Sequence, residues 1–219
     1  MDIKETNYYG FYELWIGKRR LLLTKSLDNN TFFSEKLIDG YREIEPRRSK
    51  LAAAIIKKIS KLPFNKGDKI LYLGASHGYT ASFLSDVAGE KGLIFCIDFA
   101  PRVVRDLLLL CEKRTNMIPI LADANKPLTY ADRIEKCDIL YQDIAQKNQL
   151  EIFIKNFIHL KQKAFAILVV KTRSIDVTKS PKRIAEEIHS KLSEKVRIID
   201  YKDLNPLEKD HYFFLCKLK

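Results

Sequence analysis

The sequence has few cysteines and no long apolar stretch, and these two absences exclude several classes of protein. The cysteines, Cys96, Cys111, Cys137 and Cys216, are scattered and form no CxxC pair. This pattern argues against a zinc site and a disulfide framework, so we expect no metal and reduced thiols. The apolar runs are too short to cross a bilayer, and no secretion signal is evident. These features predict a cytoplasmic protein without a membrane partner.

A basic charge on the two flanks is the main compositional feature. The 219 residues are 46% hydrophobic, which fits one α/β domain with a small appendage. The formal net charge is +11, of which residues 1–62 carry +5, residues 63–146 carry −1 and residues 147–219 carry +7. This excess favours a polyanionic partner, most often a nucleic acid. A lysine-rich solvated surface would give the same composition.

The stretch Ile70–Thr80 has the pattern of a buried strand, a glycine turn and a helix. An apolar run ends at Leu73, Gly74 and Gly78 follow, and helical spacing begins near Thr80. Glycines there let the backbone approach a ligand, whose anionic groups would meet the helix N-terminus. Asp98 ends the next apolar run, where a carboxylate is well placed to bind ribose hydroxyls. The pattern favours a nucleoside-containing cofactor over a plain turn with a surface aspartate.

Strand and helix patterns alternate along most of the chain. Residues 1–45 resemble a small antiparallel β unit, and residues 46–219 form the larger predicted domain. A helix is expected from Ser49, its candidate N-cap. Repeated βαβ units predict a parallel sheet with helices on both faces. The expected strands are 70–73, 93–97, 118–121, 138–141 and 164–170, with helices at 79–88, 101–113, 128–135 and 149–160.

The end of the chain departs from this alternation. A helix near 181–192 precedes strands at 196–201 and 211–215, which are joined by too few residues for a parallel crossover. The last two strands should therefore be antiparallel. A seven-stranded, mostly parallel sheet with such a hairpin is the Rossmann-like plan of S-adenosylmethionine-dependent methyltransferases. A nicotinamide dehydrogenase is less favoured, because GxGxxG is absent.

The reversed last strand has a consequence for polar side chains. Asp143 ends the fourth strand, Lys171 ends the fifth, and His211 begins the reversed strand. All three should meet at the edge where open α/β sheets bind ligands. Each alone could be a capping or surface residue, but together they favour an acid/base cluster.

Several longer motifs strongly resemble the fibrillarin family, in the family's order and over about residues 40–216. The chain has no glycine/arginine-rich tail, so it resembles the compact archaeal form. The motifs are Tyr41-Arg-Glu, Pro46-Arg-Arg-Ser-Lys-Leu-Ala-Ala-Ala-Ile, Leu71-Tyr-Leu-Gly-Ala-Ser, Ile118-Pro-Ile, Asp123-Ala-Asn-Lys-Pro, Asp143-Ile-Ala-Gln, Ser174-Ile-Asp-Val-Thr and Glu208-Lys-Asp-His.

The resemblance implies an S-adenosylmethionine-dependent RNA ribose 2′-O-methyltransferase acting on rRNA, with tRNA as a further candidate substrate. It further implies a box C/D ribonucleoprotein with a guide RNA, a target RNA, a Nop5-type scaffold and the kink-turn protein L7Ae. Two other readings stay open: a non-catalytic structural subunit of the same kind of ribonucleoprotein, and a same-fold methyltransferase with a non-RNA acceptor.

The resemblance also implies the site residues. The family's Lys-Asp-Lys-His set falls on Lys50, Asp143, Lys171 and His211. Tyr79 and His77 replace a usual threonine and a usual small residue, which makes the glycine turn bulkier, and Asp98 replaces a usual glutamate that is one methylene longer. The implied cofactor contacts are Gly74, Ala75, Tyr79, Thr80, Asp98, Phe99, Asp123, Ala124, Asp143, Ile144, Ala145 and Gln146.

Two further groups of residues, one basic and one aromatic, are expected to contact RNA and to form core, respectively. Basic residues near the same edge are plausible phosphate contacts, which would position RNA without reading its sequence. Aromatic residues of the N-terminal β unit are expected to be core rather than interface. The basic residues are Arg47, Arg48, Lys50, Arg173, Lys179, Lys182 and Arg183, and the aromatic residues are Tyr9, Phe11, Trp15, Phe32 and Phe33.

Overall fold

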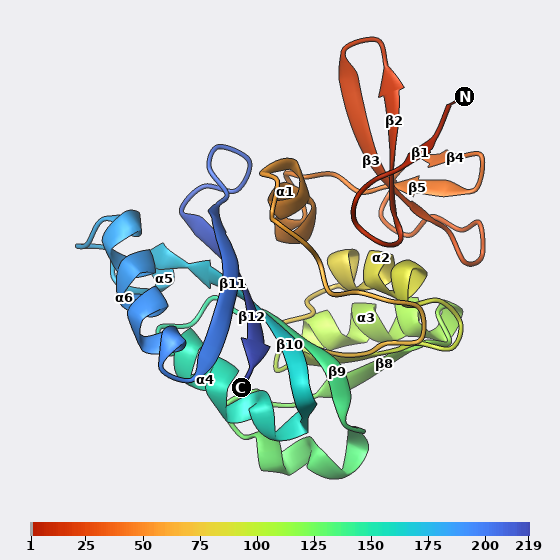
Figure 1. Ribbon diagram of the computed structural model, residues 1–219. Helices are drawn as coiled ribbons and strands as arrows, with labels where there is room; N and C mark the ends of the chain where they lie inside the picture. Colours follow the sequence, from red (N-terminus) through yellow and green to blue (C-terminus); the bar gives the residue numbers. More distant parts are fainter. Residues whose placement is uncertain (1) are drawn as a thin grey trace.

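The computed structural model describes residues 2–219, which form two separate sheets (Figure 1). The smaller sheet is antiparallel, with the strand order β1-β2-β3-β5-β4, and it confirms the predicted N-terminal β unit. Its strands are β1 (Lys4–Glu5), β2 (Phe11–Ile16), β3 (Arg19–Lys25), β4 (Leu37–Ile38) and β5 (Tyr41–Glu43).

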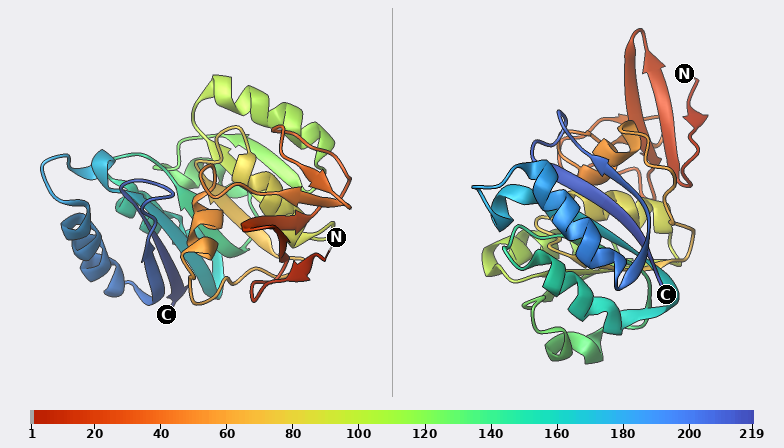
Figure 2. Two further views of the ribbon diagram at one scale, coloured as in Figure 1. Left: turned by 90° about the horizontal axis from the view of Figure 1, so that it is seen from above. Right: turned by 60° about the vertical axis from the view of Figure 1, so that its left-hand side comes forward.

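The aromatic residues of this unit divide between core and surface. Phe11 is buried, and Phe32 and Phe33 are half-buried against the main core. Tyr9 is 50% exposed and Trp15 is 56% exposed, so the expectation that all five aromatic residues are core is wrong for these two. The reason is visible in Figure 2, where the β2–β3 hairpin that carries Trp15 projects away from the body of the molecule.

The larger sheet has seven strands in the order β11-β12-β10-β9-β6-β7-β8. Every adjacent pair from β10 to β8 is parallel, whereas β12 is antiparallel to both of its neighbours. This confirms the predicted mostly parallel sheet and the terminal antiparallel hairpin. The strands are β6 (Lys69–Leu73), β7 (Leu93–Asp98), β8 (Met117–Leu121), β9 (Cys137–Asp143), β10 (Leu160–Lys171), β11 (Val196–Asp203) and β12 (His211–Leu218).

Helices cover both faces of the large sheet, because alternate strand residues point to opposite faces. Tyr72 and Tyr141 belong to the core shared with α1, α2 and α3. Leu71 and Leu140, their neighbours in the sequence, belong to the core shared with η1, α4 and α6. The helices are α1 (Lys50–Ile56), α2 (Tyr79–Ala88), α3 (Pro101–Lys113), the 3₁₀ turn η1 (Pro127–Arg133), α4 (Gln149–Lys155), the 3₁₀ turn η2 (Asn156–His159), α5 (Thr172–Ile175) and α6 (Pro181–Ser193).

Several predicted boundaries differ from the structure, and those near residue 160 differ most. The helix expected over 149–160 ends at Lys155, continues as the 3₁₀ turn η2, and gives way to β10 at Leu160. Residues 161–163 of β10 are exposed and polar, and β10 meets β9 with an irregular register between Leu160 and Phe165. A polar strand segment that is paired only intermittently lacks the apolar pattern from which a strand is predicted.

A buried ionic cluster, formed by Glu35, Arg42, Asp86 and Arg114, joins the small sheet to the helices. Arg42 of β5 lies 2.8 Å from the Asp86 carboxylate of α2 and also pairs with Glu35. Arg114, just after α3, pairs with the other Asp86 oxygen. All four side chains are at most 2% exposed. This cluster therefore fixes the small sheet against α2 and α3.

The described residues contain neither a membrane-spanning helix nor a metal-binding cluster. Within residues 2–219, no helix combines the length and the apolarity that crossing a bilayer would require. The same residues contain no group of three or more histidine, cysteine, aspartate or glutamate side chains arranged to hold a metal ion.

Candidate functional site

The turn after β6 requires glycine for two different reasons. Gly74 has φ +78°, and a Cβ atom there would overlap the backbone carbonyl of Asp143 at the end of β9. Gly78 has φ +87°, and a Cβ atom there would overlap the Leu107 and Leu110 side chains of α3. Gly78 therefore serves helix packing, and Gly74 brings the turn against the end of β9.

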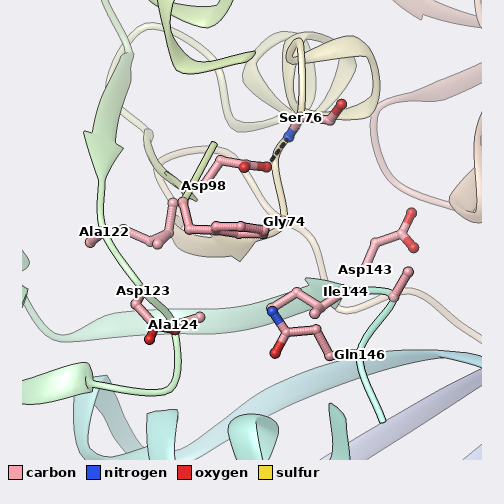
Figure 3. Close-up of a pocket in the computed structure, with 12 residues that line it drawn as sticks. Gly74, Ser76, Asp98, Ala122, Asp123, Ala124, Asp143, Ile144 and Gln146 are labelled. Carbon is pink, nitrogen blue, oxygen red and sulfur yellow. Dashed lines mark hydrogen bonds between the residues drawn. The ribbon is translucent and has the colours of Figure 1, made fainter. Parts of the chain in front are cut away.

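A cavity of about 350 Å³ lies at the carboxyl ends of β6, β7, β8 and β9 (Figure 3). This volume is in the range of small-molecule sites. The Asp98 carboxylate accepts hydrogen bonds from the Ser76 amide at 2.9 Å and the Ala100 amide at 3.1 Å, which holds it at the cavity wall. The lining residues are Gly74, Ser76, Ile97, Asp98, Phe99, Ala122, Asp123, Ala124, Asp143, Ile144, Ala145 and Gln146.

Three residues expected to bind cofactor do not line this cavity, namely Ala75, Tyr79 and Thr80. The Tyr79 hydroxyl accepts a hydrogen bond from the Glu45 amide at 3.0 Å, and its ring packs against the N-terminal segment. Thr80 is buried and donates to the Ser49 hydroxyl at 3.1 Å. Any contact from Tyr79 to a ligand in this cavity would therefore come from its backbone.

The bulky side chains in the glycine turn leave the cavity open. His77 points toward α3, where its Nε2 lies 3.4 Å from the Asp106 carboxylate. The Tyr79 ring stacks beneath the Arg48 guanidinium, 4.3 Å from its centre. The two departures from the family pattern therefore add contacts outside the cavity.

Polar contacts connect the loops after β8 and β9, which carry several of the cofactor contacts that the family resemblance implies. The Asp123 carboxylate accepts a hydrogen bond from the Asn125 amide at 2.9 Å. The Asn125 side chain donates to the Gln146 side chain at 3.1 Å. Buried Asn156 donates to the carbonyl of Ala124 at 2.9 Å. These bonds hold the loops after β8 and β9 at a set separation.

Asp143 belongs both to the cavity wall and to a cluster of charged side chains beside it. Its carboxylate lies 3.3 Å from the Lys50 ammonium at the start of α1. Ser49 caps α1 by accepting a hydrogen bond from the Ala52 amide, which sets where Lys50 projects. Burial alone would lower the pKa of Lys50, but the Asp143 and Glu208 carboxylates raise it above its ordinary value. Lys50 is therefore a cation at neutral pH.

His211 joins this cluster from β12. It is paired with Lys171 across the β10–β12 register, so two residues 40 positions apart in sequence lie side by side. Its Nδ1 lies 2.7 Å from the carbonyl of Lys209. A carbonyl only accepts, so Nδ1 carries the proton and Nε2 keeps its lone pair. Burial lowers the pKa of His211, despite the opposing Lys209 carbonyl and Asp143. The imidazole is therefore neutral at neutral pH.

Glu208 is a cluster member that was not assigned a role from the sequence. It lies in the loop between β11 and β12, and burial raises its pKa, with Lys50 opposing and Asp143 adding to the shift. Its position in the motif Glu208-Lys-Asp-His211 was the available signal, since the reversed strand brings this whole loop to the edge of the site. The structure thus brings Lys50, Asp143, Lys171 and His211 together and adds a carboxylate to them.

Most of the basic residues considered as phosphate contacts already have partners. Arg173, for example, pairs with Asp210 at 3.3 Å. Within residues 2–219, exposed Arg47 and Lys182 make no ion pair, which leaves their charges available. The partnered residues are Arg48, Lys50, Arg173, Lys179 and Arg183.

Comparisons of sequence place the chain among described proteins. The family model described as fibrillarin matches residues 3–219. A fibrillarin-like rRNA/tRNA 2′-O-methyltransferase from Methanocaldococcus jannaschii is 44% identical, covering 98% of this chain and 96% of that protein. One of the same name from Pyrococcus horikoshii is 38% identical, covering 99% of both chains.

Comparisons of structure agree. A Methanococcus jannaschii fibrillarin, described as a pre-rRNA processing protein, has a TM-score of 0.92 and 43% identity, covering 100% of this chain and 98% of that one. An Aeropyrum pernix fibrillarin with natively bound S-adenosyl-L-methionine has a TM-score of 0.90 and 36% identity, covering 99% and 98%. A fibrillarin in complex with Nop5p has a TM-score of 0.85 and 39% identity, covering 91% and 94%.

Proposed function

The chain belongs to the fibrillarin family, and from this premise we propose that it is an S-adenosylmethionine-dependent RNA ribose 2′-O-methyltransferase. The target class is rRNA and tRNA, as the names of its relatives state. The observation that carries the proposal is the position of Asp143, which lines the cofactor-sized cavity and also pairs with Lys50 of the charged cluster. A binding site and an acid/base cluster thus share one residue.

The cavity residues fit S-adenosylmethionine. The fixed Asp98 carboxylate keeps lone pairs that can accept hydrogen bonds from ribose hydroxyls. Phe99, which lines the cavity and is 65% exposed, offers a flat apolar surface for adenine. The backbone and side chains from Asp143 to Gln146 would flank the sulfonium. We propose these residues, with Gly74, Asp123 and Ala124, as the cofactor contacts.

The chemistry requires little from the protein beyond positioning and proton handling. The bound cofactor supplies an activated methyl group on a sulfonium. A ribose 2′-hydroxyl is a poor nucleophile, because it holds its proton tightly at neutral pH. The protein must therefore align the hydroxyl, exclude water and accept or direct that proton.

The cluster residues have properties suited to these tasks. We propose that Asp143 orients the hydroxyl or accepts its proton, since its carboxylate is held between the cavity and Lys50. Lys171 would stabilise the developing negative charge on the oxygen. Neutral His211, with Nδ1 engaged by Lys209, would use the Nε2 lone pair to orient a neighbouring group. Cationic Lys50 would hold Asp143 in place.

The proposed assembly is a box C/D ribonucleoprotein. The support for a Nop5-type scaffold is the close structural similarity to a fibrillarin solved with Nop5p. A guide RNA, a target RNA and an L7Ae-type kink-turn protein are finer proposals that rest on the family resemblance. Sequence choice would then come from guide base pairing, and the isolated chain would bind RNA weakly and with strong salt dependence. A cytoplasmic location stays a prediction from the sequence.

The test is reconstitution with a Nop5-type protein, an L7Ae-type protein and a guide RNA, followed by mapping of ribose methylation on a complementary strand. We expect methylation at one guided nucleotide, dependent on S-adenosylmethionine. A non-complementary strand is the control for guidance. Methyl transfer to a small molecule or a protein instead would overturn the RNA assignment. Cofactor binding without any transfer in the complete complex would favour a structural subunit.

A further inference from the structure

The side chain of Gln149, the first residue of α4, is bonded to the backbone of Lys171. Its Oε1 accepts a hydrogen bond from the Lys171 amide at 3.0 Å, and its Nε2 donates to the Lys171 carbonyl at 3.1 Å. Gln149 is completely buried. Its carboxamide therefore satisfies both backbone groups of one residue, as a neighbouring strand would.

The reason for this arrangement lies in the sheet. The β9–β10 register ends at Val169, which is paired with Asp143, because β9 turns away after that residue. Lys171 lies two residues further and has no β9 partner. Its amide and carbonyl point away from β12, so Lys171 and His211 form a non-hydrogen-bonded antiparallel pair, the kind in which side chains lie closer together. Gln149 thus completes the sheet where β9 has left it.

The same carboxamide is also bonded to the loop after β9, which lines the cavity. Its Nε2 donates to the carbonyl of Gln146, a cavity-lining residue, at 2.9 Å. The backbone carbonyl of Gln149 accepts a hydrogen bond from the Gln142 side chain at 2.6 Å, one residue before Asp143. One buried residue therefore connects the end of β9, the cavity wall and the end of β10.

We propose that Gln149 is a positioning residue for methyl transfer. It holds the backbone of Lys171 in a fixed position relative to the cavity-lining loop after β9. The inference rests on the proposed function and goes beyond it, because Gln149 does not line the cavity and contacts Lys171 through the backbone of that residue. Without the carboxamide, the amide and carbonyl of Lys171 would lose the hydrogen bonds that they make on the β9 side. A displacement of about 1 Å at a reacting group can reduce a rate by about 100-fold.

Gln149→Met tests this by removing all three side-chain hydrogen bonds at nearly constant volume. In the reconstituted complex with saturating S-adenosylmethionine and RNA, we expect the single-turnover methylation rate to fall by roughly 10- to 100-fold. RNA affinity should be unchanged, since no phosphate contact is altered. Thermal unfolding would verify that the variant is folded at the assay temperature.

Gln149→Glu gives a readout that a purely structural role would not produce. A neutral carboxyl keeps one acceptor and one donor, whereas a carboxylate donates nothing, and burial raises the pKa of an introduced carboxyl. The rate of this variant relative to wild type should therefore rise as the pH falls from 8 to 6. The ratio for Gln149→Met should not vary with pH. The pH dependence of the Gln149→Glu ratio decides the inference by itself, even if the methionine variant fails to fold.

Asn116→Asp is a matched control. Asn116 is buried and donates through its amide to the carbonyls of Ser85 and Gly89, far from the site in the fold. It should lower the unfolding temperature while keeping the methylation rate of the folded protein near that of wild type. Wild-type rates in both Gln149 variants, or equal and pH-independent losses in all three variants, would overturn the inference alone. An inactive wild-type complex would overturn the proposed function, and this inference with it.

Discussion

Two clusters in this molecule combine basic side chains with carboxylates, but in different surroundings. The buried ionic cluster, between the small sheet and α2, combines two arginines with two carboxylates that are at most 2% exposed. The charged cluster at the edge of the large sheet combines lysines, carboxylates and a histidine. There, the paired Lys50 and Asp143 side chains are 24% and 22% exposed.

The difference lies in how each charge is satisfied. Asp86 accepts hydrogen bonds from Arg42, Arg114, the Thr24 hydroxyl and the Leu27 amide, so its oxygens have no capacity left for a ligand. Asp143 forms an ion pair with Lys50 and also faces a cavity. A buried carboxylate whose oxygens are saturated holds elements together, whereas a carboxylate with free capacity beside a cavity can bind and react. Clustering of charge alone does not identify a functional site.

Substitution in the charged cluster at the edge of the large sheet should produce the largest effect on activity. Asp143→Ala and Lys171→Ala should each reduce methylation by about 100- to 10,000-fold, the usual contribution of a positioned acid or base. At least one of the two variants should still bind S-adenosylmethionine, measured by calorimetry. Full activity in both variants would remove the cluster from the mechanism.

Substitution in the buried ionic cluster should instead reduce the stability of the folded protein. Asp86→Asn leaves the buried guanidinium groups of Arg42 and Arg114 without their shared anion, which should lower the free energy of unfolding by about 3–5 kcal/mol. Asp143→Asn should change it by no more than about 1 kcal/mol, as for partly exposed ion pairs. Urea denaturation of both variants would check this, and equal losses would show that the two clusters do not differ as described.

The charged cluster should also make the stability of the protein depend on pH, through His211. Because the folded state lowers the pKa of His211, the unfolded state binds more protons below pH 6.5, the ordinary histidine value. Stability should therefore fall as the pH decreases through this value. His211→Gln should flatten the slope, measured by denaturation between pH 5 and pH 8. Burial also lowers the pKa of His159, so part of the slope should remain in this variant.

The smallest expected effect concerns the exposed charges outside both clusters. Replacement of Arg47 and Lys182 by alanine should weaken RNA binding by the complex slightly and equally for all sequences. Each lost phosphate contact should reduce the slope of log affinity against log salt by about 1. Binding measured across a salt series would check this, and an unchanged slope would show that neither residue contacts phosphate.

Much of the fold was predictable because it depends on periodic patterns. The β6 turn, the helices α2 and α3, and the reversed β12 follow from apolar runs and loop length. Lys171 and His211 were placed together by topology alone. Gln149 could not be predicted in this way, because its role depends on a side chain that reaches the backbone of another strand. No pattern in the sequence records such a contact.

Surface exposure was the other feature beyond sequence reasoning. Trp15 lies on a strand of alternating residues, which is consistent with either face. Only the projection of the β2–β3 hairpin decides that the ring is exposed. The same holds for the bulky residues of the glycine turn. Their size can be read from the sequence, but the orientation of His77 toward Asp106 cannot.

Gly74 has a consequence for how this enzyme can change over evolutionary time. The atom missing from its side chain makes room for the Asp143 carbonyl, so the turn that would hold the cofactor and the strand that presents the carboxylate are in direct contact. A single mutation there would push both apart at once. A substitution of Gly74 should therefore change cofactor affinity and methyl-transfer rate together, because the same absent Cβ atom allows the turn and the strand to meet.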